Sequence, residues 1–361
     1  MKMTISRTQL FFMIIKTQIG IGLLSLPSDT QSIAGGDSWI SVLLAGAVIQ
    51  LVLFVYWHLL KKYPNDTLSE ITIHLLGRYL GKAINVVYYA FFVLIAAYAC
   101  SLYAELINIW MLPLTPGWVL LLLIVGTSVY LALDNLRVIA RFFVFSSILF
   151  VVLILISFLN FNSVMHISNI LPVGQSGMMP ILSGSEKTFF SMLGFEVTLY
   201  FYSQVQGNRK GMLSVISAAN GFVTLFYTYF VLICLMGLSP KALEQVNEPV
   251  LFLFKGLSFQ LFDRLDLIFL TIWIIPMTAT IVSYLCVAGK SLTTKRGSYR
   301  KLVWFSGGIV FITAWFITTI ENMRPFSKWL EYGYLIMIAA VPVLLWLSSF
   351  LVKTHEKVGS V

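Results

Sequence analysis

Residues 20–27 read GIGLLSLP, and they lie in the middle of the first apolar stretch of the chain, at about residues 8–33. A second interruption, Gly194-Phe195-Glu196, lies inside the sixth apolar stretch, at about residues 187–206. The hydrocarbon core of a bilayer cannot hydrogen-bond a free backbone, so a glycine-interrupted helix persists there only where protein or a polar cavity satisfies it. The two interruptions therefore predict a binding site near the middle of a membrane.

The composition is that of an integral membrane protein. Apolar residues make up 58% of the chain and charged residues only 11%, whereas soluble domains carry about 25% charged residues. A helix needs about 20 apolar residues to cross a hydrocarbon core of about 30 Å. We therefore predict an all-α fold of ten transmembrane helices in a single domain over residues 1–361. The predicted spans are 8–33, 38–60, 83–111, 117–134, 138–159, 187–206, 212–238, 265–289, 302–320 and 331–352.

The net charge of +9 is distributed unevenly between the predicted loops. Seventeen of the 24 basic residues lie in one set of loops and at the two ends of the chain. Basic residues in short loops are retained on the cytoplasmic side, so both termini are predicted to be cytoplasmic. A nucleic-acid surface would need these residues clustered on one soluble face. They are scattered between spans, so no nucleic-acid partner is expected.

The ten predicted spans divide into two repeats, at about residues 8–159 and 187–352. Spans 1 and 6 each open a repeat and each carry a glycine interruption, as expected for the discontinuous helices of inverted-repeat transporters. A break frees N–H donors on one half-helix and C=O acceptors on the other. A zwitterionic ligand fits this arrangement, with its carboxylate at the first break and its ammonium group at the second. The predicted contacts are Gly20, Ile21, Gly22, Gly194, Phe195 and Glu196. The alternative is that the glycines serve helix packing.

Two short motifs carry a resemblance to a known family. Gly20 to Pro27 resembles the first-helix motif of the amino acid/polyamine/organocation transporter superfamily, and Leu193 to Val197 resembles the sixth helix of its endospore germination permease branch. The likeness covers essentially the whole chain, including Arg264-Leu265-Asp266 at the start of span 8. It implies a LeuT-like fold of five plus five inverted helices, in which spans 1, 2, 6 and 7 form a bundle against a scaffold.

The resemblance also implies a function. Members of this branch are the B subunits of nutrient germinant receptors, so the chain would bind a small nutrient, such as an amino acid, in the bacterial cell membrane or spore inner membrane. Its partners would be a larger membrane A subunit and a lipoprotein C subunit. Two alternatives remain open, namely a proton-coupled amino acid transporter and a structural subunit with a vestigial pocket.

Two ionisable residues lie at or beside the predicted breaks, where burial of a charged group suggests function. Glu196 could accept the ligand's ammonium group, bind a proton, or hydrogen-bond the free ends of the broken helix. Lys16 precedes Gly20 by one helical turn and could place a fixed cation beneath the site, where related carriers hold an ion. Alternatively, its long side chain could reach the cytoplasmic end of the helix.

Further candidates come from spans 3 and 8. Tyr98, Leu102 and Glu105 share one helix face, and Tyr98 and Leu102 are predicted to contact the ligand, whereas Glu105 could simply reach the headgroups. In span 8, Thr278 is the predicted ligand contact, and Thr280 is an alternative. The loops at 160–186 and 240–263 could cover the outer mouth, although surface packing is the alternative for both. Thr67 to Glu70 forms a capping box that opens a short amphipathic helix.

Catalytic or metal chemistry is not expected. His58, His74, His166 and His355 are scattered without metal-ligand spacing, and there is no phosphate-binding glycine loop or serine nucleophile motif. Cys100, Cys234 and Cys286 lie in three different spans without a CxxC motif. No enzyme activity, metal or cofactor is therefore predicted.

Overall fold

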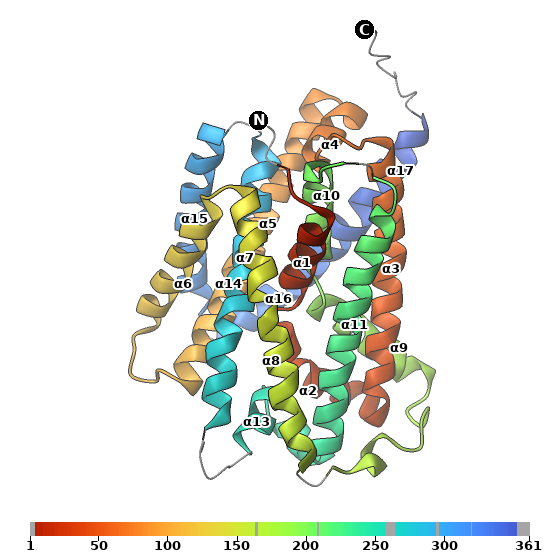
Figure 1. Cartoon of the computed structure of the whole chain (residues 1–361), viewed down its shortest axis with the longest axis vertical. Helices are drawn as coiled ribbons and strands as arrows, with labels where there is room; N and C mark the ends of the chain where they lie inside the picture. Colours follow the sequence, from red (N-terminus) through yellow and green to blue (C-terminus); the bar gives the residue numbers. More distant parts are fainter. Residues whose placement is uncertain are drawn as a thin grey trace.

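The computed structural model describes residues 4–162, 165–207, 209–256, 264–293, 296–318 and 320–351. Within these residues the chain is helical, and its one strand-like contact is an isolated bridge between Ile5 and Val205. Figure 1 shows the long helices running side by side along the longest axis. The long helices are α3 (Ser38–Lys62), α5 (Arg78–Trp110), α11 (Met212–Gly237), α14 (Leu265–Leu292) and α15 (Arg296–Ile317), and two of intermediate length are α6 (Gly117–Ala132) and α16 (Ile320–Tyr334).

Shorter helices make up the rest of the described fold. The first and sixth predicted spans contain α1 (Arg7–Gln18), α2 (Gly22–Ala34), α9 (Met178–Ser191), η4 (Phe195–Val197), α10 (Thr198–Phe201) and η5 (Tyr202–Gln204). The others are η1 (Gly35–Asp37), α4 (Leu68–Leu76), α7 (Leu136–Ser146), α8 (Ile148–Ser157), η2 (Phe158–Asn162), η3 (Ile167–Ile170), α12 (Pro240–Gln245), α13 (Pro249–Lys255), η6 (Leu335–Ala340) and α17 (Val341–Leu351).

Seven helical stretches of the described chain are long and apolar enough to cross a membrane. They are Gly22–Lys62, Arg78–Trp110, Leu136–Asn160, Met212–Gly237, Leu265–Leu292, Gly297–Ile317 and Pro325–Leu351. The chain is therefore a multi-pass membrane protein, and ten crossings remain a prediction. This criterion omits some predicted spans because their helices are too short. Helices α1, α9 and α10 are short because their spans are broken, and α6 has only 16 residues.

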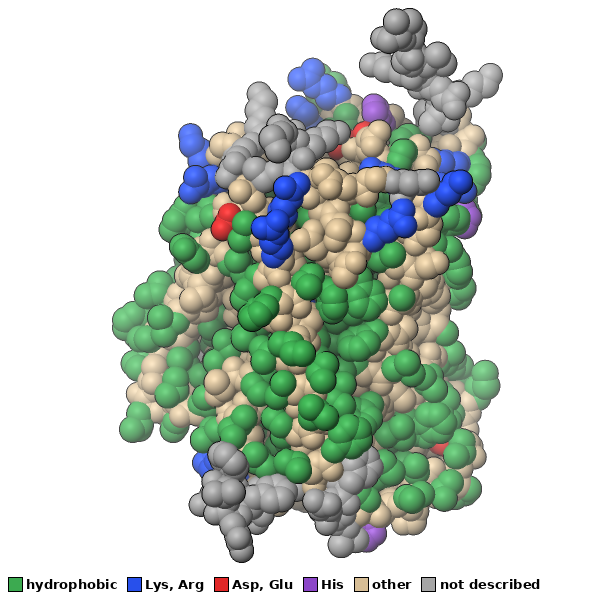
Figure 2. All heavy atoms as spheres, in the orientation of Figure 1, with side chains coloured by type: hydrophobic (Ala, Val, Ile, Leu, Met, Phe, Trp, Pro, Cys, Tyr) green, Lys and Arg blue, Asp and Glu red, His purple; other side chains and the backbone are tan. Residues whose placement is uncertain are grey.

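Basic side chains gather at one end of the molecule. On the face shown in Figure 2, Lys and Arg lie mainly at the top, while apolar side chains cover the middle. The start of α1 and the end of α17 lie toward that same end (Figure 1). This distribution agrees with the uneven placement of basic residues along the sequence, although the side of the membrane remains a prediction.

Both predicted helix breaks are present. In the first span α1 ends at Gln18 and α2 begins at Gly22, with Ile19 in an extended conformation. In the sixth span α9 ends at Ser191 and η4 begins at Phe195, and Gly194 has a φ of 126°. Only glycine adopts such a conformation readily, because it has no Cβ. The sixth span begins earlier than predicted, since α9 starts at Met178 and not at Lys187.

The glycines allow the two breaks to pack against each other. A Cβ on Gly22 would lie 2.8 Å from the carbonyl oxygen of Ser191, and one on Gly194 would lie 2.5 Å from the backbone carbon of Thr17. Each break therefore needs its glycine for close approach to the other. Gly22 and Gly194 therefore serve the close packing of helices, which was the alternative considered for the glycines of the breaks. Gly20 differs, because a Cβ there would make an ordinary contact, 3.5 Å from Thr280 Oγ1.

A wide helical turn precedes α17. Residues Leu335–Ala340 form the π-helix η6, a local widening that disturbs the regular backbone ladder. Two buried tyrosines from other helices compensate for this: the hydroxyl of Tyr56 donates to the carbonyl of Ile338 at 2.5 Å, and that of Tyr88 donates to the carbonyl of Met337 at 2.6 Å. These bonds join α3 and α5 to the last span.

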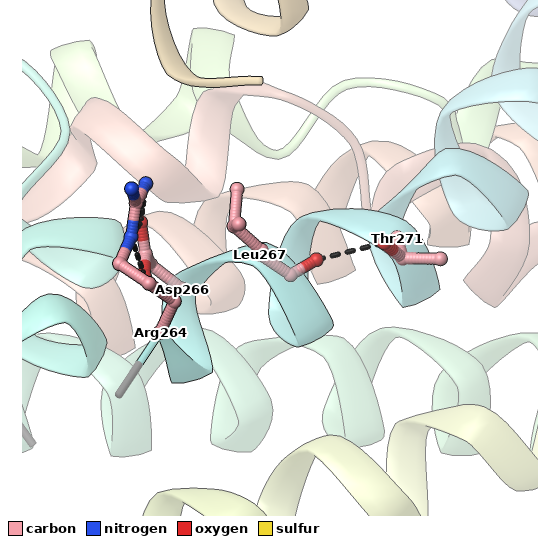
Figure 3. A network of polar contacts seen from close by, with 4 residues as sticks. All are labelled: Arg264, Asp266, Leu267 and Thr271. Carbon is pink, nitrogen blue, oxygen red and sulfur yellow. Dashed lines mark hydrogen bonds and ion pairs between the residues drawn. The ribbon is translucent and has the colours of Figure 1, made fainter. Parts of the chain in front are cut away.

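The predicted capping box is confirmed. The side chain of Thr67 and the carboxylate of Glu70 form the reciprocal bonds of this motif at the start of α4, and the Thr67 amide donates to Glu70 Oε2 at 2.7 Å. Leu68 and Ile71 are buried, so α4 packs its apolar face onto the bundle. At the start of α14, Arg264 forms a two-pronged ion pair with the buried Asp266, with Nη2 2.8 Å from Oδ2 (Figure 3). An acidic residue in the first turn also complements the helix dipole.

Two connections are attached to the broken helices. The carboxylate of Asp37 accepts the amides of Gly174 and Ser176 at 2.7 and 2.9 Å, which fastens part of the 160–186 loop to the end of α2. At the other end of the molecule, the Ile5 amide donates to the Gln204 carbonyl and the Gln206 amide donates to the Ile5 carbonyl, both at 2.9 Å. The segment before α1 is thereby joined to the end of the sixth span. Of the 240–263 loop, α12 and α13 are described, and residues 257–263 lie outside the described residues.

Candidate functional site

A cavity of about 510 Å³ lies beside the first helix break. It is lined by the end of α1, by α2, α5, α9, α14 and α16, and by the residues that precede α13. Its size is within the usual range of small-molecule sites, about 300–1,000 Å³. The sequence-predicted residues that line it are Gly20, Ile21, Gly22, Tyr98 and Leu102.

The other sequence-predicted contacts lie elsewhere. Gly194, Phe195, Glu196 and Thr278 are not among the described lining residues of this cavity, and their contact with a ligand stays a prediction. Phe195 is fully buried and packs between the rings of Tyr56 and Phe189. From the sixth span, the lining residues are instead Lys187, Phe190, Ser191 and Leu193, on the other side of the break.

Thr280 takes the place predicted for Thr278. The two residues are separated by about 200° around a helix, so only one of them can face the cavity. Thr280 lines the cavity, and its hydroxyl lies 3.3 Å from the carbonyls of both Lys16 and Thr17. The hydroxyl of Thr278 donates to the carbonyl of Ile274 in its own helix. Of the two threonines considered in span 8, the alternative Thr280 is therefore the one that borders the cavity.

The first break offers hydrogen-bond donors to the cavity. Helix α2 begins at Gly22 without a side-chain cap. The amides of Leu23 and Leu24 donate to the carbonyls of Gly20 and Ile21 at 3.4 and 3.0 Å, which leaves the amides of Ile21 and Gly22, because the first amides of an α-helix have no acceptor one turn earlier in the helix. Ile21 and Gly22 both line the cavity. The helix dipole adds partial positive charge at this end. An anionic group such as a carboxylate can therefore bind here.

Gln18 supplies an acceptor that the sequence did not reveal. It lines the cavity, and its side chain is 1% exposed. Its Nε2 donates to the carbonyl of Met192 at 3.1 Å, while its Oε1 has no hydrogen-bond partner among the described residues. A buried acceptor without a donor is costly. A ligand N–H group would satisfy it.

Tyr227 from α11 also escaped sequence analysis, and it joins the two breaks. Its hydroxyl lies 2.9 Å from the carbonyl of Gln18 and 3.1 Å from that of Ser191. Both carbonyls belong to last residues of interrupted helices. No local motif distinguishes this tyrosine from the other buried ones, because its role depends on contacts between distant parts of the chain.

Glu196 lies behind the cavity wall. It is fully buried, and its Oε2 accepts the amide of Gly194 at 2.8 Å. Its Oε1 accepts the hydroxyl of Tyr284, also at 2.8 Å, and Tyr284 does line the cavity. Three roles were considered for Glu196: binding the ligand's ammonium group, binding a proton, and hydrogen-bonding the free end of the broken helix. The bond to the Gly194 amide corresponds to the third. Tyr284 thus connects Glu196 to the cavity.

Lys16 does not extend to the membrane surface. Its side chain is 0% exposed, which excludes the alternative of a solvated ammonium group. The Nζ donates to the carbonyl of Ser146 at 3.1 Å and lies 4.0 Å from the centre of the Phe150 ring. The next residue, Thr17, donates to the Ser283 hydroxyl at 2.7 Å. Lys16 thus joins α1 to α7 and α8, and it is not a described lining residue of the cavity.

Comparison with known proteins adds the family. The family model described as "Spore germination protein" matches residues 4–347. The chain belongs to this family. The chain has relatives of similar length at low identity. It is 25% identical to spore germination protein GerQB of Bacillus cereus over 349 residues, 95% of each chain. It is 26% identical to spore germination protein YndE of Bacillus subtilis (strain 168) over 360 residues, 98% of each chain.

A solved structure has a similar fold. The spore germination protein matches the crystal structure of MhsT in complex with L-phenylalanine with a TM-score of 0.70 at 14% sequence identity, over 95% of this chain and 88% of that chain. At this identity the likeness establishes the fold alone. The fold is the LeuT-like arrangement expected from the sequence, with interrupted first and sixth spans. Family and fold together are those of permeases and not of enzymes.

Proposed function

We propose that this chain is the ligand-sensing B subunit of a spore germinant receptor and that it binds a small nutrient, such as an amino acid, in the cavity at the first helix break. One observation carries the proposal: the uncapped start of α2 and the unpartnered Oε1 of Gln18 border the same cavity. The first provides for a carboxylate and the second for an ammonium group. An α-amino acid carries both groups on one carbon atom.

Ligand binding would act by population shift. A nutrient that contacts both α2 and α9 favours the arrangement in which these elements are close, and its differential affinity biases the equilibrium. In a spore membrane the change would pass to a larger membrane A subunit and a lipoprotein C subunit. Recovery of these two subunits with the affinity-tagged chain, together with neighbouring genes that encode them, would support this assembly.

The second candidate is a proton-coupled amino acid transporter. The observation in its favour is the buried amine of Lys16, which lies close to the first break, where binding of a proton could be linked to movement of α1. The third possibility, a structural subunit, predicts that the cavity binds no nutrient.

Reconstitution into liposomes separates these functions. The purified protein is mixed with radiolabelled amino acids, and both equilibrium binding and accumulation inside the vesicles are measured with and without an imposed proton gradient. A receptor subunit binds without accumulation. Accumulation that follows the gradient would establish the transporter instead, and absence of binding to every amino acid would leave the structural subunit.

A further inference from the structure

The cavity is lined by more acidic than basic side chains. Its ionisable residues, other than tyrosines, are Asp29 from α2, Glu105 from α5, Lys187 from α9, Glu248 at the start of α13 and Glu331 from α16. Lys187 pairs with Glu331, with Nζ 3.1 Å from Oε1. One positive charge therefore faces four carboxyl groups. These groups come from four elements that are distant in sequence, so the fold gathers them.

The carboxyl groups are not arranged for a metal ion. Among the residues that the structure describes, no three His, Cys, Asp or Glu side chains are close enough to hold one. Hard divalent cations need several oxygen ligands at about 2.0–2.6 Å. Carboxylates that are spread over a cavity of this size suit an organic cation better, because its charge and its other groups contact different parts of the wall.

Gln18 gives an independent indication of the ligand. Its side-chain nitrogen already donates to the Met192 carbonyl, and its side-chain oxygen is an acceptor without a partner among the described residues. Since the residue is 1% exposed, a donor on a bound ligand is the natural partner. An ammonium group has three N–H donors.

The distance between the two binding regions suggests a second charge. Gly22, Ser25 and Asp29 line the cavity and are spaced along one face of α2. At 1.5 Å per residue, Asp29 lies about 10 Å along the helix from Gly22. Side chains in a helix point back toward its N-terminus, which shortens the reach. A carboxylate held at Gly22 therefore leaves room for an extended ligand side chain that ends near the acidic groups.

We propose that the cavity prefers solutes with a net positive charge, such as a basic amino acid, to neutral amino acids of the same length. The proposal rests on the proposed nutrient-binding function. The α-carboxylate binds at the start of α2, the α-ammonium group donates to Gln18 Oε1, and the terminal cation lies among Asp29, Glu105 and Glu248. Charge-assisted hydrogen bonds to these groups supply the preference.

Equilibrium binding to the full-length protein in nanodiscs tests this assignment with a matched pair of ligands. L-lysine and L-norleucine have side chains of similar length, and only lysine carries the terminal charge. We expect lysine to bind at least about tenfold more tightly. Equal or tighter binding of norleucine would overturn the charge preference and leave the proposed function intact. Binding of neither lysine, norleucine nor any other amino acid would overturn both.

Paired variants locate the preference in the cavity. The double variant Glu105→Gln with Glu248→Gln should reduce lysine affinity about tenfold or more and leave norleucine affinity unchanged. The control is Glu186→Gln with Glu244→Gln, since these two glutamates are exposed and are not described lining residues. The control removes the same charge from the protein. A similar loss in both double variants would show a general field effect and contradict the assigned site.

Discussion

The hydroxyl of Tyr284 lies 2.8 Å from Glu196 Oε1, and this bond joins α14 to the break in the sixth span. The Gly194 amide occupies the other carboxylate oxygen. Tyr284→Phe should therefore leave Oε1 without its donor and lower the free energy of unfolding by about 1–3 kcal/mol. Denaturant unfolding of the detergent-solubilised protein measures this loss. Tyr332→Phe is the control, because that side chain is 70% exposed, and equal stability of the two variants would contradict the role of this bond.

The glycines of the breaks should differ in their tolerance of alanine. Gly194→Ala combines an unfavourable φ with a Cβ 2.5 Å from the Thr17 backbone, so it should reduce the yield of folded protein and its Tm. Gly20→Ala makes only an ordinary contact and should fold normally, while its added methyl group narrows the cavity and lowers amino acid affinity. Size-exclusion chromatography and binding measurements distinguish the two effects. A stable Gly194→Ala variant would show that the breaks do not require this close packing.

The buried ammonium group of Lys16 should be dispensable for folding. No carboxylate among the described residues lies within ion-pair distance of it, and its neighbours include the ring of Phe150. Replacement of a buried charge by an apolar side chain of similar length is often neutral or stabilising. Lys16→Met should therefore keep its Tm and bind nutrients as a receptor subunit does. A large fall in Tm would indicate that Lys16 is structurally essential, and loss of proton-driven uptake alone would favour the transporter.

Binding of a cationic ligand should weaken in mild acid. Burial and the nearby carboxylate of Glu105 raise the pKa of Glu248 above its ordinary value. Above this raised pKa the side chain is charged and attracts a cation, and as the pH falls through it the attraction is lost. The other charged groups around the cavity are Asp29, Lys187 and Glu331. Lysine affinity should fall as the pH is lowered toward the ordinary range of glutamate, and Glu248→Gln should make the profile flatter. An unchanged profile in that variant would exclude Glu248 as the titrating group.

The orientation of the chain can be read by cysteine labelling. Thr8 in the first turn of α1 and Ser183 in α9 are exposed, whereas Cys100, Cys234 and Cys286 are buried. The start of α1 lies toward one end of the molecule and α9 toward the other (Figure 1). If the termini are cytoplasmic, a membrane-impermeant maleimide should label Ser183→Cys in intact cells and label Thr8→Cys only after permeabilisation. The reverse pattern would invert the topology derived from the basic residues.

The sequence was sufficient to predict the breaks because their cause is local. Glycine in an apolar span is conspicuous, and the match between Gly20 and Gly194 follows from repeat order. The capping box at Thr67 is local as well. The function of Gly22 was harder to predict, since its need for close approach to Ser191 arises from a residue far along the chain.

The cavity wall was predicted only in part, because small rotations of a helix decide which residue faces inward. Tyr98 and Leu102 line the cavity, and in span 8 the lining residue is Thr280 and not Thr278. Gln18 was missed because a polar residue beside a break has no distinctive spacing. The acidic lining was missed for a different reason: Asp29, Glu105 and Glu248 come together only in the folded protein.

The bridge between Ile5 and Val205 joins the segment before α1 to the end of the sixth span, so a movement of one affects the other. If α1 swings away from the bundle, it must either carry the end of the sixth span with it or lose two backbone hydrogen bonds, at about 1 kcal/mol each. The cavity lies at the other end of α1, where Thr17 and Gln18 line it. A ligand that displaces this end of α1 would therefore act on Ile5 and, through its two backbone bonds, on the end of the sixth span.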